Sequence, residues 1–110
     1  CRVPHGLACA VMLPVALRVN RHVRQAELAR LAHAAFPHDR AASPEAAVEM
    51  FIQRIEQLCR EVGIPERLSA LGVQREHIPA IVAGSRGTSM SGNPRDLSDA
   101  ELTELLEAML

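Results

Sequence analysis

The sequence predicts an all-α fold, an irregular bundle of five to six helices. Apolar residues recur at three- and four-residue steps along most of the chain, and no segment shows the apolar/polar alternation of a half-buried strand. The 110 residues are 48% apolar and 23% charged, a composition that supplies one core and argues against intrinsic disorder. A chain of this length fits a single domain, and we expect a compact or nearly compact one.

The first predicted helix covers about residues 5–19 and has apolar residues on nearly every face. Such a helix is expected to lie centrally in its bundle. Pro14 lies inside it and predicts a kink rather than an end, because the apolar run continues beyond it. A second helix is predicted over about residues 24–35, where the Phe36-Pro37 pair ends it.

The third predicted helix is the clearest element. Ser43 supplies a capping hydroxyl, Pro44 takes the first helical position, and Gly63 provides a left-handed stop. One face is apolar at three- and four-residue steps, through Val48, Phe51, Ile52, Ile55, Leu58, Cys59 and Val62.

The C-terminal third is predicted as short helices around one loop. Two short helices cover about residues 65–71 and 75–83, and the Gly- and Ser-rich segment 84–95 is expected to be a loop. Long ordered loops in compact domains are usually functional. The last helix opens with a capping box between Ser98 and Glu101. Its apolar face comprises Leu102, Leu105, Leu106 and Met109.

Charge and aromatic content argue against a nucleic-acid partner. The 12 basic residues, all Arg, face 13 acidic ones, and Phe36 and Phe51 are the only rings for base stacking. No apolar run reaches the roughly 18 residues of a membrane span. The longest, residues 7–17, lacks the flanks of a signal peptide. Three cysteines without paired spacing fit a reducing compartment, so we expect a cytoplasmic protein without a membrane partner.

Histidines are the candidate chemical groups, since phosphate-binding loops and nucleophile elbows are absent from the sequence. His33, His38 and Asp39 lie close in sequence, but a solvated surface is favoured there over a metal site. His22 and His77 have no partner cluster, and exposed histidines are favoured at both positions.

A second grouping lies at the start of the chain. Cys1, His5 and Cys9 are spaced by four residues and would share one face of an ideal helix, where they could hold zinc. Pro4 disfavours a helix that reaches back to Cys1. His5 can project beyond the helix end toward a cavity, although periodicity alone favours a capping or core histidine. Cys59 is predicted to be a small core residue.

Segments across the chain resemble one enzyme family. Residues 3–14, Val-Pro-His-Gly-Leu-Ala-Cys-Ala-Val-Met-Leu-Pro, with Leu17 and Asn20, resemble the Pro-His-Gly segment of the iron-containing (group III) alcohol dehydrogenases. Residues 91–102 resemble that family's Asn-Pro-Arg loop and closing helix, and residues 71–73 and 78–79 are similar to its Leu-Gly-Val and Ile-Pro turns. The resemblance spans essentially the whole chain, in order and without a gap.

The resemblance implies an enzyme that interconverts alcohols and aldehydes or ketones by hydride transfer to or from NAD or NADP. That family holds one divalent metal, usually iron and sometimes zinc, with one Asp and three His. His5 falls on the last of these histidines, and the metal would polarise the substrate oxygen. Ser89, Gly92 and Asn93 fall where the family's loop borders nicotinamide and substrate, although a plain interhelix connection is an equal alternative.

The family's other metal ligands and its dinucleotide-binding domain precede the Pro-His-Gly segment, whereas this chain begins four residues before His5. We therefore expect residues 1–110 to be a partial helical domain, inactive alone and without a bound metal or cofactor. No catalytic residue is assigned. The alternative is a non-enzymatic helical module, derived from this fold, that associates with other proteins. Because a cut core exposes apolar faces, we also expect a homo-oligomer.

Overall fold

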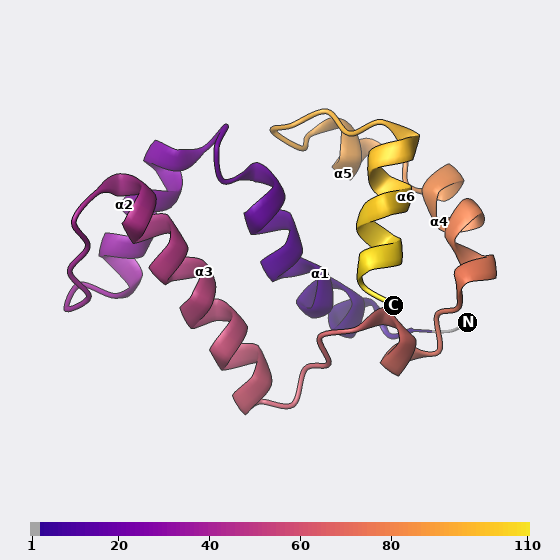
Figure 1. The fold of residues 1–110 in the computed structure, drawn as a ribbon, viewed down its shortest axis with the longest axis horizontal. Helices are drawn as coiled ribbons and strands as arrows, with labels where there is room; N and C mark the ends of the chain where they lie inside the picture. Colours follow the sequence, from indigo (N-terminus) through magenta and orange to yellow (C-terminus); the bar gives the residue numbers. More distant parts are fainter. Residues whose placement is uncertain (1–2) are drawn as a thin grey trace.

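A computed structural model describes residues 3–110, except for the side chains of Thr88 and Ser89, and this part of the chain is helical without strands (Figure 1). This confirms the predicted all-α class. The elements are α1 (His5–Asn20), α2 (Gln25–Ala35), α3 (Pro44–Glu61), two 3₁₀ turns η1 (Leu68–Leu71) and η2 (Arg75–His77), α4 (Ile78–Gly84), α5 (Thr88–Ser91) and α6 (Asp99–Ala108).

Local capping signals set the helix ends where the sequence predicts them. The Ser43 hydroxyl accepts the Ala46 backbone N–H at 3.1 Å, and Gly63 adopts a φ of 83° just beyond α3. At α6 the Ser98 hydroxyl and the Glu101 carboxylate each accept the other residue's backbone N–H at 3.1 Å. The bounds of α3 and α6 lie close to the predicted ones, and so do those of α1 and α2, whose first turns have no side-chain cap.

Two predictions for the C-terminal third are wrong. The helix expected over residues 65–71 is only the turn η1, which Gly72 ends with a φ of 84°. The segment expected to be all loop contains α5, and its first residue, Gly84, belongs to α4. Met90 explains α5, since its side chain packs against the buried residues of the C-terminal part, and tertiary burial overrides the weak helix propensity of Gly and Ser.

The buried residues form two separate clusters, here called the hairpin core and the C-terminal core. The hairpin core joins α2 to α3, and its buried members are Leu28, Ala29, Ala32, Ala47, Val48 and Ile52. The C-terminal core joins α1 to the elements after residue 63, and its buried members are Val11, Leu68, Val73, Ile78, Val82, Leu102, Leu106 and Met109. In Figure 1, α1 lies between α2 and α3 on one side and α4 and α6 on the other.

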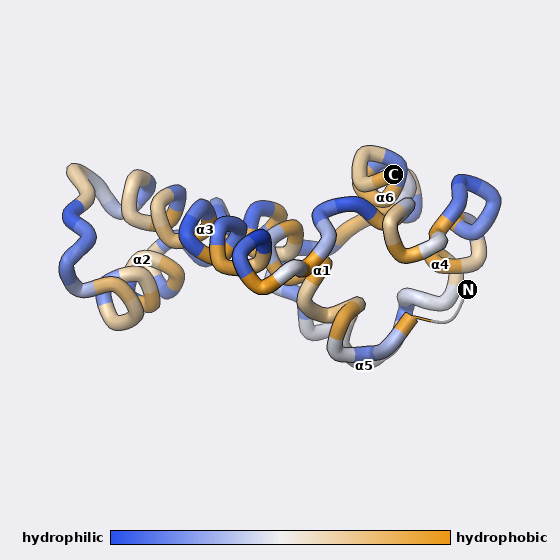
Figure 2. The backbone as a smooth tube through the Cα atoms, turned by 90° about the horizontal axis from the view of Figure 1, so that it is seen from below, coloured by the Kyte–Doolittle hydropathy of each residue, from blue (hydrophilic) through white to orange (hydrophobic). Residues whose placement is uncertain are grey.

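This arrangement is longer than a compact bundle of the same size. The radius of gyration is 14.9 Å, and the molecule measures 43 × 30 × 21 Å. A compact domain of this length has a radius of gyration of about 13 Å. The chain is thus nearly compact rather than compact, because α2 and α3 lie toward one end of the longest axis and α4 and α6 toward the other (Figure 2).

The helix α1 is central, as predicted, but it is incompletely covered. It continues through Pro14, and Val11 is its one fully buried residue, while Leu13 is 47% exposed. The distal part of α3 is also uncovered, with Leu58 and Val62 exposed. The reason is length, because 11 residues of α2 cannot cover 18 residues of α3 at 1.5 Å per residue.

No helix in residues 3–110 is long and apolar enough to cross a membrane.

Candidate functional site

His5 is the first residue of α1 and is exposed to solvent. The extended backbone of Pro4, with a ψ of 136°, sets the helix start at this position. One turn later on the same face lies Cys9, also exposed, whose Sγ is 3.5 Å from His5 Nε2. The core interpretation of His5 is therefore wrong, because its ring lies on the surface of the helix end.

His5 and Cys9, two of the three residues considered for a zinc grouping and disfavoured there, lie next to each other, and Cys1 lies outside the described residues. Among residues 3–110, no three His, Cys, Asp or Glu side chains gather in a way that could hold a metal ion. Cys59 is half-buried rather than part of a core. This part of the chain thus offers His5 as one available imidazole rather than a full ligand cage.

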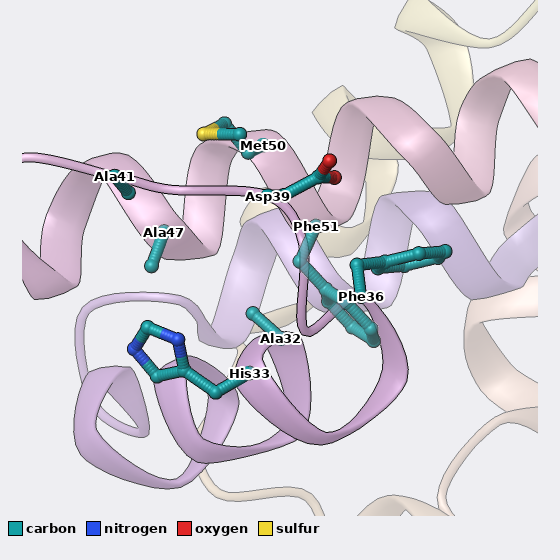
Figure 3. A pocket seen from close by; sticks show the side chains of 8 residues that line it. All are labelled: Ala32, His33, Phe36, Asp39, Ala41, Ala47, Met50 and Phe51. Atoms are coloured by element: carbon teal, nitrogen blue, oxygen red, sulfur yellow. The ribbon is translucent and has the colours of Figure 1, made fainter.

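The grouping of His33 and Asp39 lines a pocket between α2 and α3 (Figure 3). Asp39 forms an ion pair with Arg54, with Oδ2 and Nε 3.3 Å apart. The Arg54 guanidinium carbon lies 4.8 Å from the centroid of the Phe36 ring, over its face. The space enclosed is about 10 Å³, no more than one water molecule needs. His33 and His38 are exposed, so the favoured prediction of a solvated surface agrees with the structure.

The other two histidines have local structural partners. His77 Nδ1 accepts the backbone N–H of Gln74 at 2.9 Å and so caps η2. His77 is half-buried, whereas the sequence predicted an exposed histidine. The reason is that this capping contact holds the ring against the turn. His22 is exposed, as predicted, and its Nε2 accepts Arg21 Nε–H at 3.4 Å.

A side-chain hydrogen bond ties the segment 84–97 to α1. Asn93 Oδ1 accepts Asn20 Nδ2–H at 2.8 Å, and Asn93 Nδ2 donates to the Arg95 carbonyl at 2.6 Å. Gly92 is exposed, and the side chain of Ser89 lies outside the described residues. The contacts of Asn93 show how the segment is positioned, and the pocket-lining role of Ser89, Gly92 and Asn93 stays a prediction.

An ionic cluster joins α1 to α3, and sequence reasoning did not find it. Arg18 contacts Glu49 at 3.2 Å and Glu56 at 2.6 Å, and Arg21 contacts Glu49 at 3.0 Å. The hydrogen bond to Glu56 raises the pKa of Arg18 despite partial burial. The only sequence signal is that Arg18 interrupts an apolar helix. The cluster adds ion pairs between the C-terminal end of α1 and α3.

The pKa of Glu49 is lowered within this cluster. Desolvation by burial works in the opposite direction, but hydrogen bonds from Gln53 and Arg18, with the charges of Arg18 and Arg21, outweigh it. Because the Glu49 and Arg18 side chains are 36% and 37% exposed, each such pair stabilises the fold by no more than about 1 kcal/mol.

Comparison with known proteins places the whole chain in one family. Residues 1–110 match the model of the C-terminal part of the Fe-containing alcohol dehydrogenase family. The chain is 32% identical over 103 residues to lactaldehyde reductase of Escherichia coli, covering 93% of this chain and 27% of that protein. It is 36% identical over 115 residues to a 1-propanol dehydrogenase of Salmonella typhimurium, covering 98% and 31%.

A solved structure agrees with these sequence matches. A crystal structure of 1,3-propanediol oxidoreductase superposes with a TM-score of 0.89 at 28% identity, over 98% of this chain and 28% of that one. The chain thus spans between a quarter and a third of the length of these relatives. Together with the helical fold, the matches show that this chain belongs to the Fe-containing alcohol dehydrogenase family, as part of its C-terminal region.

Proposed function

We propose that this chain is the C-terminal helical portion of an NAD(P)-dependent, metal-containing alcohol dehydrogenase, in which His5 is one metal ligand. The observation that carries the proposal is the family match over all 110 residues. The resemblance assigns the metal-binding histidine of the Pro-His-Gly segment to His5, whose ring is exposed at a helix end. The parent enzyme is proposed to act in the cytoplasm as a homo-oligomer.

The residues present fit one corner of a metal site. A neutral imidazole has a ring-nitrogen lone pair available for a cation, and the thiol of Cys9, a weak hydrogen-bonding group, lies 3.5 Å from Nε2 of His5. Iron or zinc, when bound, would polarise the oxygen of the alcohol or carbonyl substrate. Within residues 3–110 no three His, Cys, Asp or Glu side chains gather into a possible metal site. The remaining metal ligands are therefore proposed to come from outside these residues.

The rest of this chain positions that imidazole. Val11 anchors α1 in the C-terminal core, and Arg18 anchors the same helix to α3 through Glu49 and Glu56. Because both anchors lie on one continuous helix with His5, they hold the imidazole at a defined place relative to the bundle. The proposed contribution of this chain is therefore one metal ligand, carried at the start of a helix that packs against the rest of the bundle.

Small alcohols and carbonyl compounds are the proposed substrates. The relatives are named for lactaldehyde, 1,3-propanediol and 1-propanol, which share a short carbon chain. The 110-residue chain alone is expected to be inactive, because one imidazole cannot hold a catalytic metal tightly.

The experiment begins with mass spectrometry of the polypeptide in its source cells, where a chain of the relatives' length is expected. In that protein, His5→Ala should lower turnover with a short-chain alcohol by orders of magnitude and reduce the metal content, while NAD(P) binding stays nearly intact. His22→Ala, at another exposed histidine, is the matched control and should leave both unchanged. Retained turnover with full metal content in His5→Ala would refute the assignment.

A non-enzymatic association module is the second candidate, and the exposed side chains of Leu13, Leu58 and Val62 favour it. Uncovered apolar side chains on two neighbouring helices suit contact with another protein. A native polypeptide of only about 110 residues, without dehydrogenase activity, would support this candidate over the enzyme.

A further inference from the structure

His5 and Cys9 form a pair of metal-binding side chains that lie four residues apart on one helix. Both residues are exposed, and His5 Nε2 is 3.5 Å from Cys9 Sγ. Residues at positions i and i+4 of a helix share a face, and two histidines at this spacing hold zinc in helical metalloprotease motifs. The spacing alone therefore permits two donors to meet one ion.

The distance between the two donor atoms agrees with a zinc site. Zinc binds sulfur at about 2.3 Å and imidazole nitrogen at about 2.0 Å, and a tetrahedral angle then places the two donors about 3.6 Å apart. The 3.5 Å between Nε2 and Sγ is close to this edge of a tetrahedron. The two donor atoms are therefore close enough together to contact one ion.

We propose that His5 and Cys9 together chelate a thiophilic divalent cation of the Zn²⁺ class, with Nε2 and Sγ as the two protein donors. On binding, the metal–sulfur bond forms, the S–H bond breaks, and the proton passes to solvent. Zinc and its chemical relatives accept both thiolate and imidazole, whereas magnesium and calcium prefer oxygen donors. Cys9 thus adds a sulfur donor to a site that the proposed function equips with histidine and aspartate only.

The chelate deepens the proposed function, because it uses the same His5, and it makes a separate statement about metal choice. With sulfur beside the imidazole, the site favours zinc more strongly than a site of nitrogen and oxygen donors does. Two protein donors leave the remaining positions to water in this chain. Its affinity is therefore expected to fall well short of that of a four-ligand cage.

Cobalt(II) is the probe, because a cobalt–thiolate bond produces a charge-transfer band in the near ultraviolet. The test uses the 110-residue chain with Cys1→Ser, so that this thiol cannot supply a donor. We expect the band to rise and saturate with added cobalt, and to vanish when zinc displaces it. Cys9→Ser should abolish the band, and His5→Ala should weaken cobalt binding at least tenfold. Cys59→Ser, at a thiol on another helix, is the matched control and should leave the titration unchanged.

His5 and Cys9 are exposed, so these substitutions should leave the helical circular dichroism intact. A band that persists in Cys9→Ser, an affinity unchanged in His5→Ala, or no band at millimolar cobalt would overturn the chelate. None of these results touches the proposed function, which draws further ligands from outside this chain. That function fails separately, if His5→Ala in the long protein retains metal and turnover.

Discussion

Replacing Ile52 by Ala tests the hairpin core directly. Ile52 is fully buried between α2 and α3, with 0% of its surface exposed. The substitution removes three methyl or methylene groups, each contributing about 0.8 kcal/mol of transfer free energy, or about 2.4 kcal/mol together. The neighbours on α2 include Ala29 and Ala32, whose short side chains cannot fill the void. With the cavity term, we expect a loss of about 3 to 4 kcal/mol in the free energy of unfolding.

Urea unfolding followed by far-ultraviolet circular dichroism measures this loss. Leu58→Ala, on the same helix, is the matched control, because Leu58 is 52% exposed and its removal leaves no enclosed cavity. About half the transfer term applies there, so we expect a cost of about 1 kcal/mol. Amide hydrogen exchange shows which helices lose stability in each variant. The amides of α2 and α3 should lose more protection in Ile52→Ala than those of α4 and α6, because the two cores contain different buried residues.

Two results would refute this reasoning. Equal costs for the Ile52 and Leu58 variants would mean that the exposed end of α3 is covered in solution. A uniform loss of protection across all helices would mean that the two cores unfold as one unit.

Three further predictions follow from surface and capping contacts. The chain should form a two-fold dimer at micromolar concentration by sedimentation, and Leu13→Glu should return it to monomer; a wild-type monomer that binds no hydrophobic dye would contradict this. The lowered pKa of Glu49 means that its stabilisation is complete above its usual pKa of 4.5 and is lost as pH falls through the lower folded value. Glu49→Gln should therefore flatten the acid side of the stability profile in urea titrations, and an unchanged profile would show that Glu49 contributes nothing. Ser98→Ala should cost about 1 kcal/mol by removing the α6 cap while Ser98→Thr retains most of it, and equal midpoints in thermal unfolding would argue against the capping box.

The sequence by itself determined the fold class and most helix bounds, because these depend on neighbours in the chain. Ser43, Gly63 and Ser98 act within one turn of their own position, so their residue types are sufficient to predict the ends of α3 and the start of α6. The spacing of His5 and Cys9 is local in the same sense, although sequence reasoning disfavoured the helical grouping of Cys1, His5 and Cys9 because of Pro4.

Only the tertiary structure decided which apolar faces are buried and which polar groups meet. Leu58 continues the same periodic face as Ile52, yet α2 ends before it can cover Leu58. Periodicity predicts which residues share a face, but the length and position of the partner helix decide how much of that face is buried.

Contacts between distant residues were equally beyond local reasoning. Arg18 meets Glu49 and Glu56 across 31 and 38 residues of chain, and Asn20 meets Asn93 across 73. No residue type or spacing specifies such pairs, because they exist only once the buried faces have brought α1 against α3 and the segment before α6. Capping and periodicity act along the chain and can be predicted from it, whereas burial and ion pairing between distant segments depend on the assembled helices.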